Sequence, residues 1–461
     1  MPFVTTIARI HTDDTGAYSE LPVILTPAGP LVQLVDYCVS RHDRSLSWMK
    51  KLVAAVGLFL DYLDANSEEP EHWRLFRNFA QRLYTGSFDL ETGLDPSGLC
   101  WRPLPPSTAG YIVTQISEFF EWLGEVNPSA AKLNPRYEGG AYDQRVDKTA
   151  YLYRRNKAFL GHTWATNPKK EDEGRLTRTK RSPKVSKRQP PEFPADRFEE
   201  LLFKGFKVGG TYDYRGILIT LLMHGAGFRA CEPFHLYVSD VAPNPLDPTS
   251  ALVHIHHPSL GEAPDNWRND KGKLSNRQAY LATRWAMMPR TDIVGNAGAG
   301  WKNPLLDGKH YMRASWFYPV YGKWFLQLWD VYMKQVAVIE RSHPLAFINL
   351  HREPFGGLYT LNAFKKAHKA AVLRIGLPYG KVHGTTEHGH RHSYAQRLRR
   401  GGVEPLMIQE FMHHCSIESQ ETYTRPTLAE STVALAAAAQ RMRAQSSAIL
   451  PPDRLSLTEE N

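Results

Sequence analysis

A segment near the C-terminus combines histidine, arginine and tyrosine at spacings that suit chemistry on a phosphate group. In HGHRHSYAQRLRRGGVEPLMIQEFMHHCSIESQETY, His388 and Arg391 are three residues apart, so a helix would carry both on one face. His414 follows a second predicted helix, and Tyr423 comes nine positions after it. One short segment therefore offers two imidazoles, a guanidinium and a phenol.

A second set of residues lies upstream, where Arg229 follows the predicted helix YRGILITLLMHGAG and Glu232 comes three residues later. Two arginines can hold the non-bridging oxygens of one phosphate, because a guanidinium is a permanently charged, bidentate donor. A tyrosine hydroxyl with its ordinary pKa of ~10 needs cationic neighbours to act as a nucleophile. Histidines move protons near neutral pH. These residue types favour phosphodiester exchange without a metal ion.

This pattern resembles the C-terminal box of the tyrosine recombinase and integrase family. That box reads roughly His-x-x-Arg-His, a helix, Gly-His and a tyrosine nine residues later. The chain matches it at five positions, which are His388, Arg391, His392, His414 and Tyr423. The resemblance implies that His388 assists proton movement and that His392 supports the site.

Arg229 and Glu232 match the upstream arginine box of the same family, in which the glutamate is expected to orient the arginine. The family's catalytic lysine lies in a β-hairpin, often written Lys-Thr-Lys-x-Ser-x-Arg before a strand. The segment DKGKLSNRQAYL has that spacing, so Lys271 is the expected lysine and Lys273 the second choice. One departure from the family is His413, which stands where glycine is usual.

The resemblance also implies a mechanism that needs no metal and no other cofactor. Tyr423 would attack one DNA strand, giving a 3′-phosphotyrosine link and a free 5′-hydroxyl. Lys271 would protonate the leaving 5′-oxygen, and the scissile phosphate would be held by Arg229, Arg391 and His414. The implied partners are double-stranded DNA, further copies of the chain in a tetramer on DNA, and accessory proteins encoded by the same mobile element.

The elements that must position these residues indicate a multidomain, mainly α-helical protein. Residues 1–39 are expected to form an arm with short strands. Residues 40–165 contain segments such as LSWMKKLVAAVGLFLDYL, whose apolar residues recur at three- and four-residue steps and predict an all-helical domain. By the resemblance, this is the SAM-like core-binding domain. Residues 166–193 are rich in Lys, Arg and Pro, and are either a solvated linker or a linker that follows DNA.

Residues 194–440 are expected to form the catalytic domain, a mixed α/β domain of the tyrosine recombinase type with a small antiparallel sheet. Its strands are predicted at ALVHIHH and RQAYLAT. The stretch 290–345 is aromatic and longer than the family minimum. It would either shape DNA contacts, form a subunit interface or be a packed aromatic insertion. Residues 441–461 are expected to be a polar tail.

Composition bounds the class of protein. The chain has 461 residues, a formal net charge of +9, 42% hydrophobic and 22% charged residues, which suits a globular protein with a polyanionic partner. No apolar run approaches the ~20 residues of a membrane span, and no secretion signal is readable. The four cysteines are scattered, which favours a reducing compartment, here the bacterial cytosol or nucleoid.

Three alternatives remain open at this stage. The histidines of HIHHP, EHGHRH and MHHC could bind zinc, which would indicate a metallohydrolase. A DNA-binding protein without catalysis could keep the same fold. A tyrosine topoisomerase would use the same first step without strand exchange. The sequence does not reveal the target DNA, or whether the task is integration, transposition or resolution.

Overall fold

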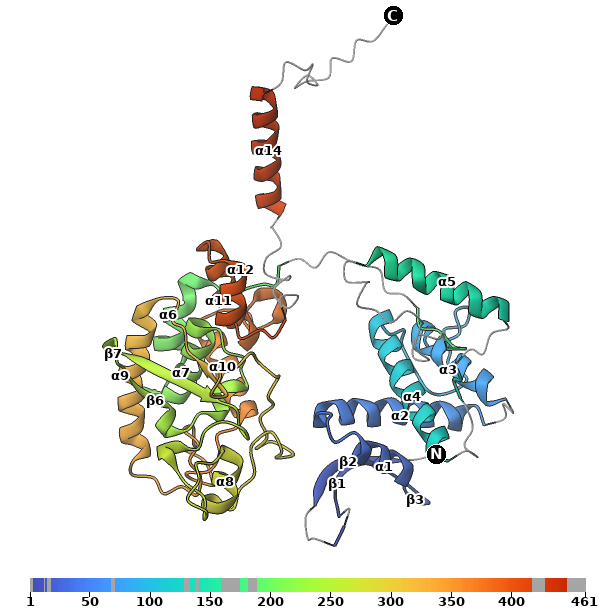
Figure 1. Cartoon of the computed structure of the whole chain (residues 1–461), viewed down its shortest axis with the longest axis horizontal. Coiled ribbons are helices and arrows are strands. Elements are labelled where there is room, and N and C mark those ends of the chain that lie inside the picture. The colour runs from blue at the N-terminus through green and yellow to red at the C-terminus, as the bar shows by residue number, and fades with distance from the viewer. Residues whose placement is uncertain are drawn as a thin grey trace, which may run out of the picture. The chain divides into compact units, whose positions relative to one another are not determined.

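The computed structural model describes two compact units of the chain, Met1–Val185 and Ser186–Asn461 (Figure 1). The described residues are 3–11, 13–14, 18–67, 71–127, 133–136, 141–158, 175–180, 189–416 and 428–445. Each unit has its own hydrophobic core. Most of the predicted linker 166–193 lies outside the described residues.

The first unit begins with a small antiparallel sheet that packs on helices. Its strands, in sheet order, are β1 (Val4–Ile10), β2 (Ser19–Thr26) and β3 (Gly29–Pro30). The helices are α1 (Val32–Ser40), α2 (Leu46–Ala65), α3 (His72–Thr85), α4 (Pro106–Val126) and α5 (Ala141–Lys157). Leu21 and Ile24 of β2 join one core cluster with Leu52 of α2 and Phe119 of α4. The stretch expected as an arm therefore shares a core with the helices that follow it.

Aromatic side chains hold α2 and α3 together. Phe59 of α2 contacts Phe76 and Phe79 of α3, with ring centroids 5.8 and 5.0 Å apart in edge-on geometry. Ser45 caps the start of α2 by accepting a hydrogen bond from the Trp48 amide. The apolar periodicity of this helix thus predicted both its extent and its buried face.

The second unit surrounds a three-stranded antiparallel sheet with helices. The strands, in sheet order, are β6 (Val241–Asn244), β7 (Asp247–His256) and β8 (Tyr311–Arg313). The main helices are α7 (Tyr214–Ala226), α9 (Pro319–Val336), α10 (Leu361–Arg374), α11 (Glu387–Arg400) and α12 (Pro405–Phe411). Shorter elements are α6 (Phe198–Glu200), α8 (Arg277–Trp285) and the β4–β5 pair (Lys207–Val208, Thr211–Tyr212). Helix α14 (Leu428–Gln445) follows.

Helix α7 is the centre of the second unit, because every residue from Arg215 to Ala226 is buried. Helices α9 and α11 both pack against it. A helix that is apolar around its whole circumference must be covered on all sides. The end of α7 is consequently a fixed point from which the following loop starts.

Two expectations for the second unit change. The predicted strand RQAYLAT is wrong, since these residues form helix α8. The Asn276 side chain caps that helix by accepting from the Ala279 amide at 2.9 Å, and Leu281 buries its apolar face. The unassigned stretch 290–345 contains β8 and all of α9, whose Phe325, Trp329 and Tyr332 lie in the main core. This part of the chain is a structural layer of the unit.

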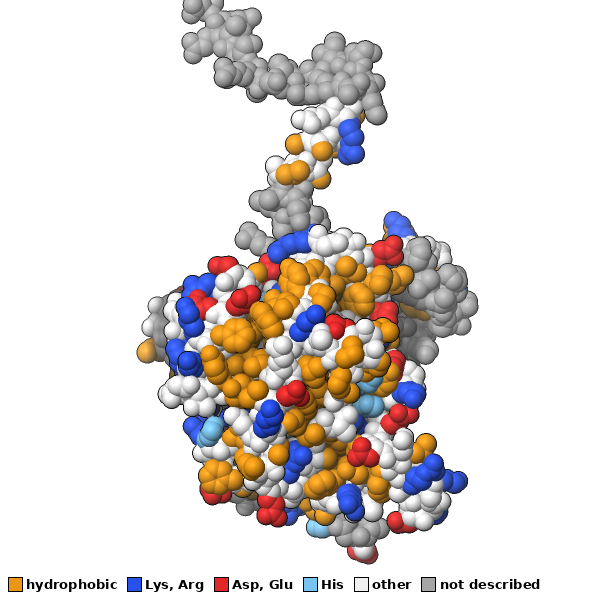
Figure 2. Space-filling view, turned by 90° about the vertical axis from the view of Figure 1, so that its left-hand side faces the viewer, with side chains coloured by type: hydrophobic (Ala, Val, Ile, Leu, Met, Phe, Trp, Pro, Cys, Tyr) orange, Lys and Arg blue, Asp and Glu red, His pale blue; other side chains and the backbone are white. Residues whose placement is uncertain are grey.

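The outer side of α9 is also partly apolar. Figure 2 shows this side of the second unit, where hydrophobic side chains gather between scattered charged ones. Val320 and Val331 of α9 are 41% and 38% exposed. In the described residues, no helix is long and apolar enough to cross a membrane.

Candidate active site

Arg391 lies where three segments of the second unit meet. Its buried guanidinium donates to the carbonyl oxygens of Gly227 and, at 2.6 Å, of Met412. Gly227 ends helix α7, and Met412 ends helix α12. Arg229 lies two residues after Gly227, and His414 lies two residues after Met412. Arg391 therefore brings together the two turns that carry the other predicted phosphate-binding residues.

Arg229 is held by Glu232. The carboxylate accepts from the Arg229 backbone amide at 2.7 Å and from its guanidinium at 2.8 Å. Glu232 is fully buried, whereas the Arg229 side chain keeps 17% of its surface exposed. The pair therefore leaves the Arg229 side chain partly exposed while its partner is fully buried.

The two predicted site histidines lie in the field of these arginines. Burial, assisted by the charges of Arg391 and Arg229, lowers the pKa of His414 to about 3. Burial also lowers the pKa of His388, and the charges of Arg391, Lys302, Arg229 and Lys365 add to that effect. Both imidazoles are therefore neutral near pH 7, a state in which one ring nitrogen donates a hydrogen bond and the other accepts one.

His392 and His413 flank the site. The rings of His388 and His392 lie 5.8 Å apart and nearly parallel, and burial lowers the pKa of His392 to about 4. His413 has a positive φ of 51°, in the left-handed region that favours glycine. Its ring stacks on Phe228 at 5.3 Å. The family's usual glycine suits this backbone, and the stacking contact holds histidine there instead.

The predicted lysines are not brought to this cluster. Lys271 and Lys273 are exposed in a turn where both backbone amides donate to the Asn269 side chain at 3.1 Å. Within the described ranges, no hydrogen bond or ion pair joins either lysine to the arginines or to His414. Arg277, the last member of the expected hairpin motif, is buried against Asp240 instead of facing outward. Antiparallel bridges join Arg268 to Leu274 and Glu262 to Asn276 around this turn, as in a hairpin, but helix α8 follows where a strand was predicted.

Lys302 is a further cation near the predicted site, and the sequence did not reveal it. It lies in the long connection 257–310 between β7 and β8, and its charge acts on His388 and on Cys231, two residues after Arg229. The same segment is attached beside His414, since the Leu305 amide donates to the His413 carbonyl at 3.2 Å and the Cys415 thiol contacts the Asn303 carbonyl at 2.7 Å. The sequence around Lys302, GAGWKNP, carries no recognisable motif, so only the fold draws attention to this lysine.

Two buried arginines fasten this connection to the unit. Arg277 pairs with Asp240 and lies over the Tyr237 ring at 3.9 Å. Arg290 donates to the carbonyl oxygens of Phe234 and Tyr359 at 3.2 and 3.0 Å. The connection is therefore anchored to the rest of the unit by these two arginines, and this anchoring positions Lys302.

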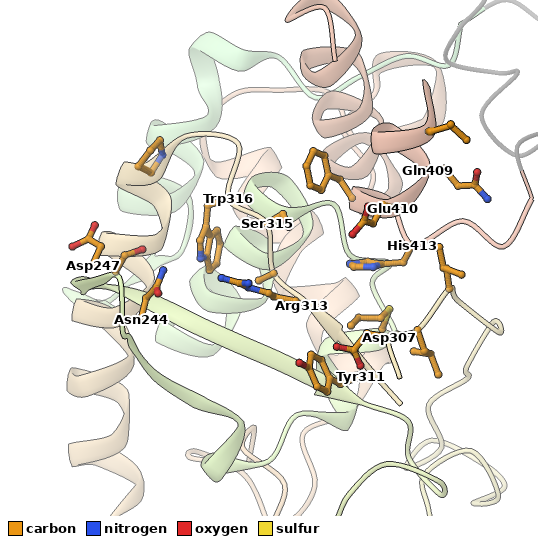
Figure 3. A pocket seen from close by; sticks show the side chains of 18 residues that line it. Asn244, Asp247, Asp307, Tyr311, Arg313, Ser315, Trp316, Gln409, Glu410 and His413 are labelled. Carbon is orange, nitrogen blue, oxygen red and sulfur yellow. The ribbon is translucent and has the colours of Figure 1, made fainter. Parts of the chain in front are cut away.

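A cavity of about 840 Å³ opens beside His413. Figure 3 shows its lining, with Arg313 and Asp307 from the β8 side and Glu410 and His413 from the α12 side. Three carboxylates, of Asp247, Asp307 and Glu410, line it with Arg313, so the cavity is not a phosphate cradle. It adjoins the cationic cluster without being the place where the arginines converge.

Tyr423 lies outside the described residues, so its distance to the arginines is not part of the structure. Among the residues that are described, no group of three or more His, Cys, Asp or Glu side chains is arranged to hold a metal ion. The histidines considered as zinc ligands are instead divided between the cationic cluster, the sheet and a buried chain of imidazoles.

No protein-family model and no curated protein matches this sequence. Among solved structures, the chain is similar to the XerH site-specific recombinase bound to its palindromic difH substrate. The identity is 14%, the match covers 88% of this chain and 84% of that one, and the TM-score is 0.47. The chain is also similar to the Tn1549 transposon integrase in complex with transposon right end DNA. The identity is 14%, the match covers 84% of this chain and 99% of that one, and the TM-score is 0.35. For lambda integrase bound to DNA, the identity is 8%, the match covers 86% of this chain and 95% of that one, and the TM-score is 0.39. With TM-scores below 0.5, this likeness carries no argument about activity.

Proposed function

We propose that this chain is a site-specific DNA recombinase of the tyrosine type, which cuts and rejoins DNA through a 3′-phosphotyrosine link to Tyr423. The observation that carries the proposal is the position of Arg391 between the carbonyls that precede Arg229 and His414. Residues far apart in sequence, each of a type suited to phosphate chemistry, converge there. The motif spacing alone requires no such convergence.

In the proposed reaction, the Tyr423 oxygen attacks the scissile phosphorus and the bond to the 5′-oxygen breaks. Arg229 and Arg391 stabilise the charge that gathers on the non-bridging oxygens, since preorganised cations act most strongly where solvent is excluded. His414 completes the phosphate site, and a neutral His388 takes up a proton. The 5′-hydroxyl of a partner duplex then attacks the phosphotyrosine and regenerates the tyrosine.

A lysine is proposed to protonate the leaving 5′-oxygen. Lys271 and Lys273 have the spacing of the family motif but lie in an exposed turn. Lys302 lacks the motif, yet its charge reaches His388. We include Lys302 as the third candidate because its segment is also attached beside His414, through the Leu305 amide and the Asn303 carbonyl.

We further propose that the reaction takes place in a tetramer on double-stranded DNA and serves a mobile element, with accessory proteins. The basic composition supports a DNA partner, because lysines and arginines placed on phosphates release condensed counterions. The proposal therefore includes DNA binding that weakens steeply as salt increases.

The experiment is a covalent-adduct assay. The protein is incubated in EDTA with nicked suicide duplexes taken from the sequences that flank its gene, and denaturing gels show any protein–DNA adduct. We expect an EDTA-resistant adduct that is absent in Tyr423→Phe and strongly reduced in Arg391→Ala. Tyr318→Phe, which changes an exposed tyrosine, is the matched control and should behave as the wild type.

Two outcomes contradict the proposal. An adduct that persists in Tyr423→Phe would exclude this tyrosine as the nucleophile. Specific binding of a flanking duplex without any adduct would favour a DNA-binding protein that has no strand-cleavage activity.

A further inference from the structure

A chain of three buried histidines runs behind the helix that carries His388 and Arg391. His224 of α7, His390 of α11 and His368 of α10 are 1%, 0% and 0% exposed. The Nδ1 atoms of His224 and His390 lie 3.2 Å apart, and the Nε2 atoms of His390 and His368 lie 2.8 Å apart. The chain thus links three helices at the centre of the second unit.

The two ends of this chain have opposite character. At one end, Arg397 of α11 approaches Nε2 of His224 at 2.7 Å and also donates to the His224 carbonyl. At the other end, Nδ1 of His368 lies 3.7 Å from a carboxylate oxygen of Glu387, which accepts from the Tyr379 hydroxyl at 2.8 Å. A guanidinium only donates hydrogen bonds, and a carboxylate only accepts them. The chain therefore has a single direction.

That direction determines the tautomer of each ring. His224 accepts from Arg397 at Nε2, so its proton lies on Nδ1 and is donated to His390. His390 accepts at Nδ1 and carries its proton on Nε2, which donates to His368. His368 accepts at Nε2 and carries its proton on Nδ1, facing Glu387. His224 and His390 then each use one nitrogen as acceptor and the other as donor. In the described part of the chain, Nδ1 of His368 lies 3.7 Å from the Glu387 carboxylate and has no hydrogen-bond partner.

The surroundings keep these rings neutral and in place. Phe198 stacks on His224 with centroids 3.6 Å apart, and Phe193 stacks on His390 at 4.3 Å. Burial lowers the pKa of His368 to about 3 and holds the pKa values of His224 and His390 well below the ordinary histidine value. A protonated ring would have no second acceptor in this chain, so the neutral form is the one that fits.

We infer that His224, His390 and His368 are positioning residues, which set the rotation of α11 against α7 and so place Arg391 between the Gly227 and Met412 carbonyls. Hydrogen bonds of the chain attach α11 at His390 and Arg397, and Glu387 at the start of α11 lies 3.7 Å from the last ring. A rotation of α11 that moves Arg391 also breaks the hydrogen bonds that His390 and Arg397 make in the chain. This role rests on the proposed function only where strand cleavage is the readout.

The first test does not depend on activity. Long-range ¹H–¹⁵N correlation spectra of protein labelled at histidine report which ring nitrogen carries the proton, and single His→Phe variants assign the signals. We expect Nδ1–H for His224, Nε2–H for His390 and Nδ1–H for His368. In Arg397→Met, which removes the donor at one end, the tautomers of the rings further along should become mixed. Pure but different tautomers in the wild type, or an unchanged His368 signal in Arg397→Met, would overturn the inference.

The second test uses strand cleavage at saturating DNA. His390→Phe keeps an aromatic ring on Phe193 but breaks the chain in the middle. We expect the rate of adduct formation to fall about 10- to 100-fold with DNA affinity unchanged, because a small displacement of a phosphate-binding group costs that much. His343→Phe, at another buried histidine, is the matched control for lost stability.

The outcomes separate this inference from the proposed function. If the wild type forms no adduct, the proposed function fails while the tautomer test still stands. If the wild type is active and His390→Phe is slowed no more than His343→Phe, the positioning role is contradicted.

Discussion

Arg229 and Arg391 are held in different ways, and the difference decides how each depends on its neighbours. Arg391 is buried and donates to two backbone carbonyls, so no single side-chain substitution removes these two acceptors. Arg229 is held by one carboxylate, which is fully buried. At the scale of single residues, Glu232 is therefore the more sensitive support.

Glu232→Gln should slow strand cleavage about tenfold, because it removes a charge-assisted hydrogen bond while keeping the shape of the side chain. The rate of adduct formation at saturating DNA measures this effect. Glu200→Gln is the control, since Glu200 pairs with Arg197 at 2.8 Å on the surface, where ion pairs contribute little. Equal rates for the two variants would mean that Glu232 does not orient Arg229.

The three lysine candidates can be separated by the leaving group. Removing the lysine that protonates the 5′-oxygen should slow cleavage about 10²- to 10⁴-fold. A duplex with sulfur in place of that oxygen should restore the rate, because a thiolate leaves without a proton. Both duplexes are used to compare Lys302→Ala, Lys271→Ala and Lys273→Ala. The control is Lys334→Ala, which changes an exposed lysine of α9. If no variant shows selective rescue, the leaving oxygen is protonated by a different group.

At the scale of elements, the end of α7 determines where the site begins. Gly227 has a φ of +76°, and a Cβ there would lie 2.4 Å from the Tyr394 ring of α11. The bare backbone lets α7 end against α11 and present its carbonyl to Arg391. The left-handed conformation and the close approach both require glycine at this position.

Gly227→Ala should lower the free energy of unfolding more than Gly376→Ala. Gly376 has the same φ of +76°, but a Cβ at this position would have no neighbour within 4 Å, so it reports the backbone strain alone, about 1–2 kcal/mol. The clash with Tyr394 should add about 1–3 kcal/mol. Urea unfolding of both variants measures the difference. Equal losses would show that Tyr394 moves aside without cost.

At the scale of the whole molecule, buried histidines link stability to pH. Burial lowers the pKa of His235, His368 and His413 to about 3 in the folded chain. The unfolded chain binds protons at these residues near the ordinary value of ~6.5, while the folded chain does not. The stability they contribute is therefore complete above pH 6.5 and is lost progressively as the pH falls toward 3.

The melting temperature should accordingly decrease steadily from pH 7 to pH 4.5. Each such histidine contributes up to about 1.4 kcal/mol per pH unit in this window. His343→Gln should flatten the slope, because burial lowers the pKa of His343 to about 4. Calorimetry across the pH range measures both chains. A melting temperature that rises on acidification would contradict the neutral state of these rings.

Local pattern determined much of this protein. His388 and Arg391 are three residues apart, and so are Arg229 and Glu232. Each pair is brought together wherever the backbone makes a helical turn. The apolar periodicity of α2 and the apolar run of α7 predicted a helix in each case, and strand β7 was also foreseen. These features depend on neighbours within a few residues.

Only the tertiary structure decided what Arg391 contacts, which lysine lies by His388, and how His224, His368 and His390 are joined. Each of these contacts links residues more than 20 positions apart, where many packings are compatible with one local pattern. The segment after Asn276 illustrates the limit, since alternation suggested a strand and the Asn276 cap with buried Leu281 made it helix α8. Long-range packing selects one arrangement because most buried polar groups must find partners.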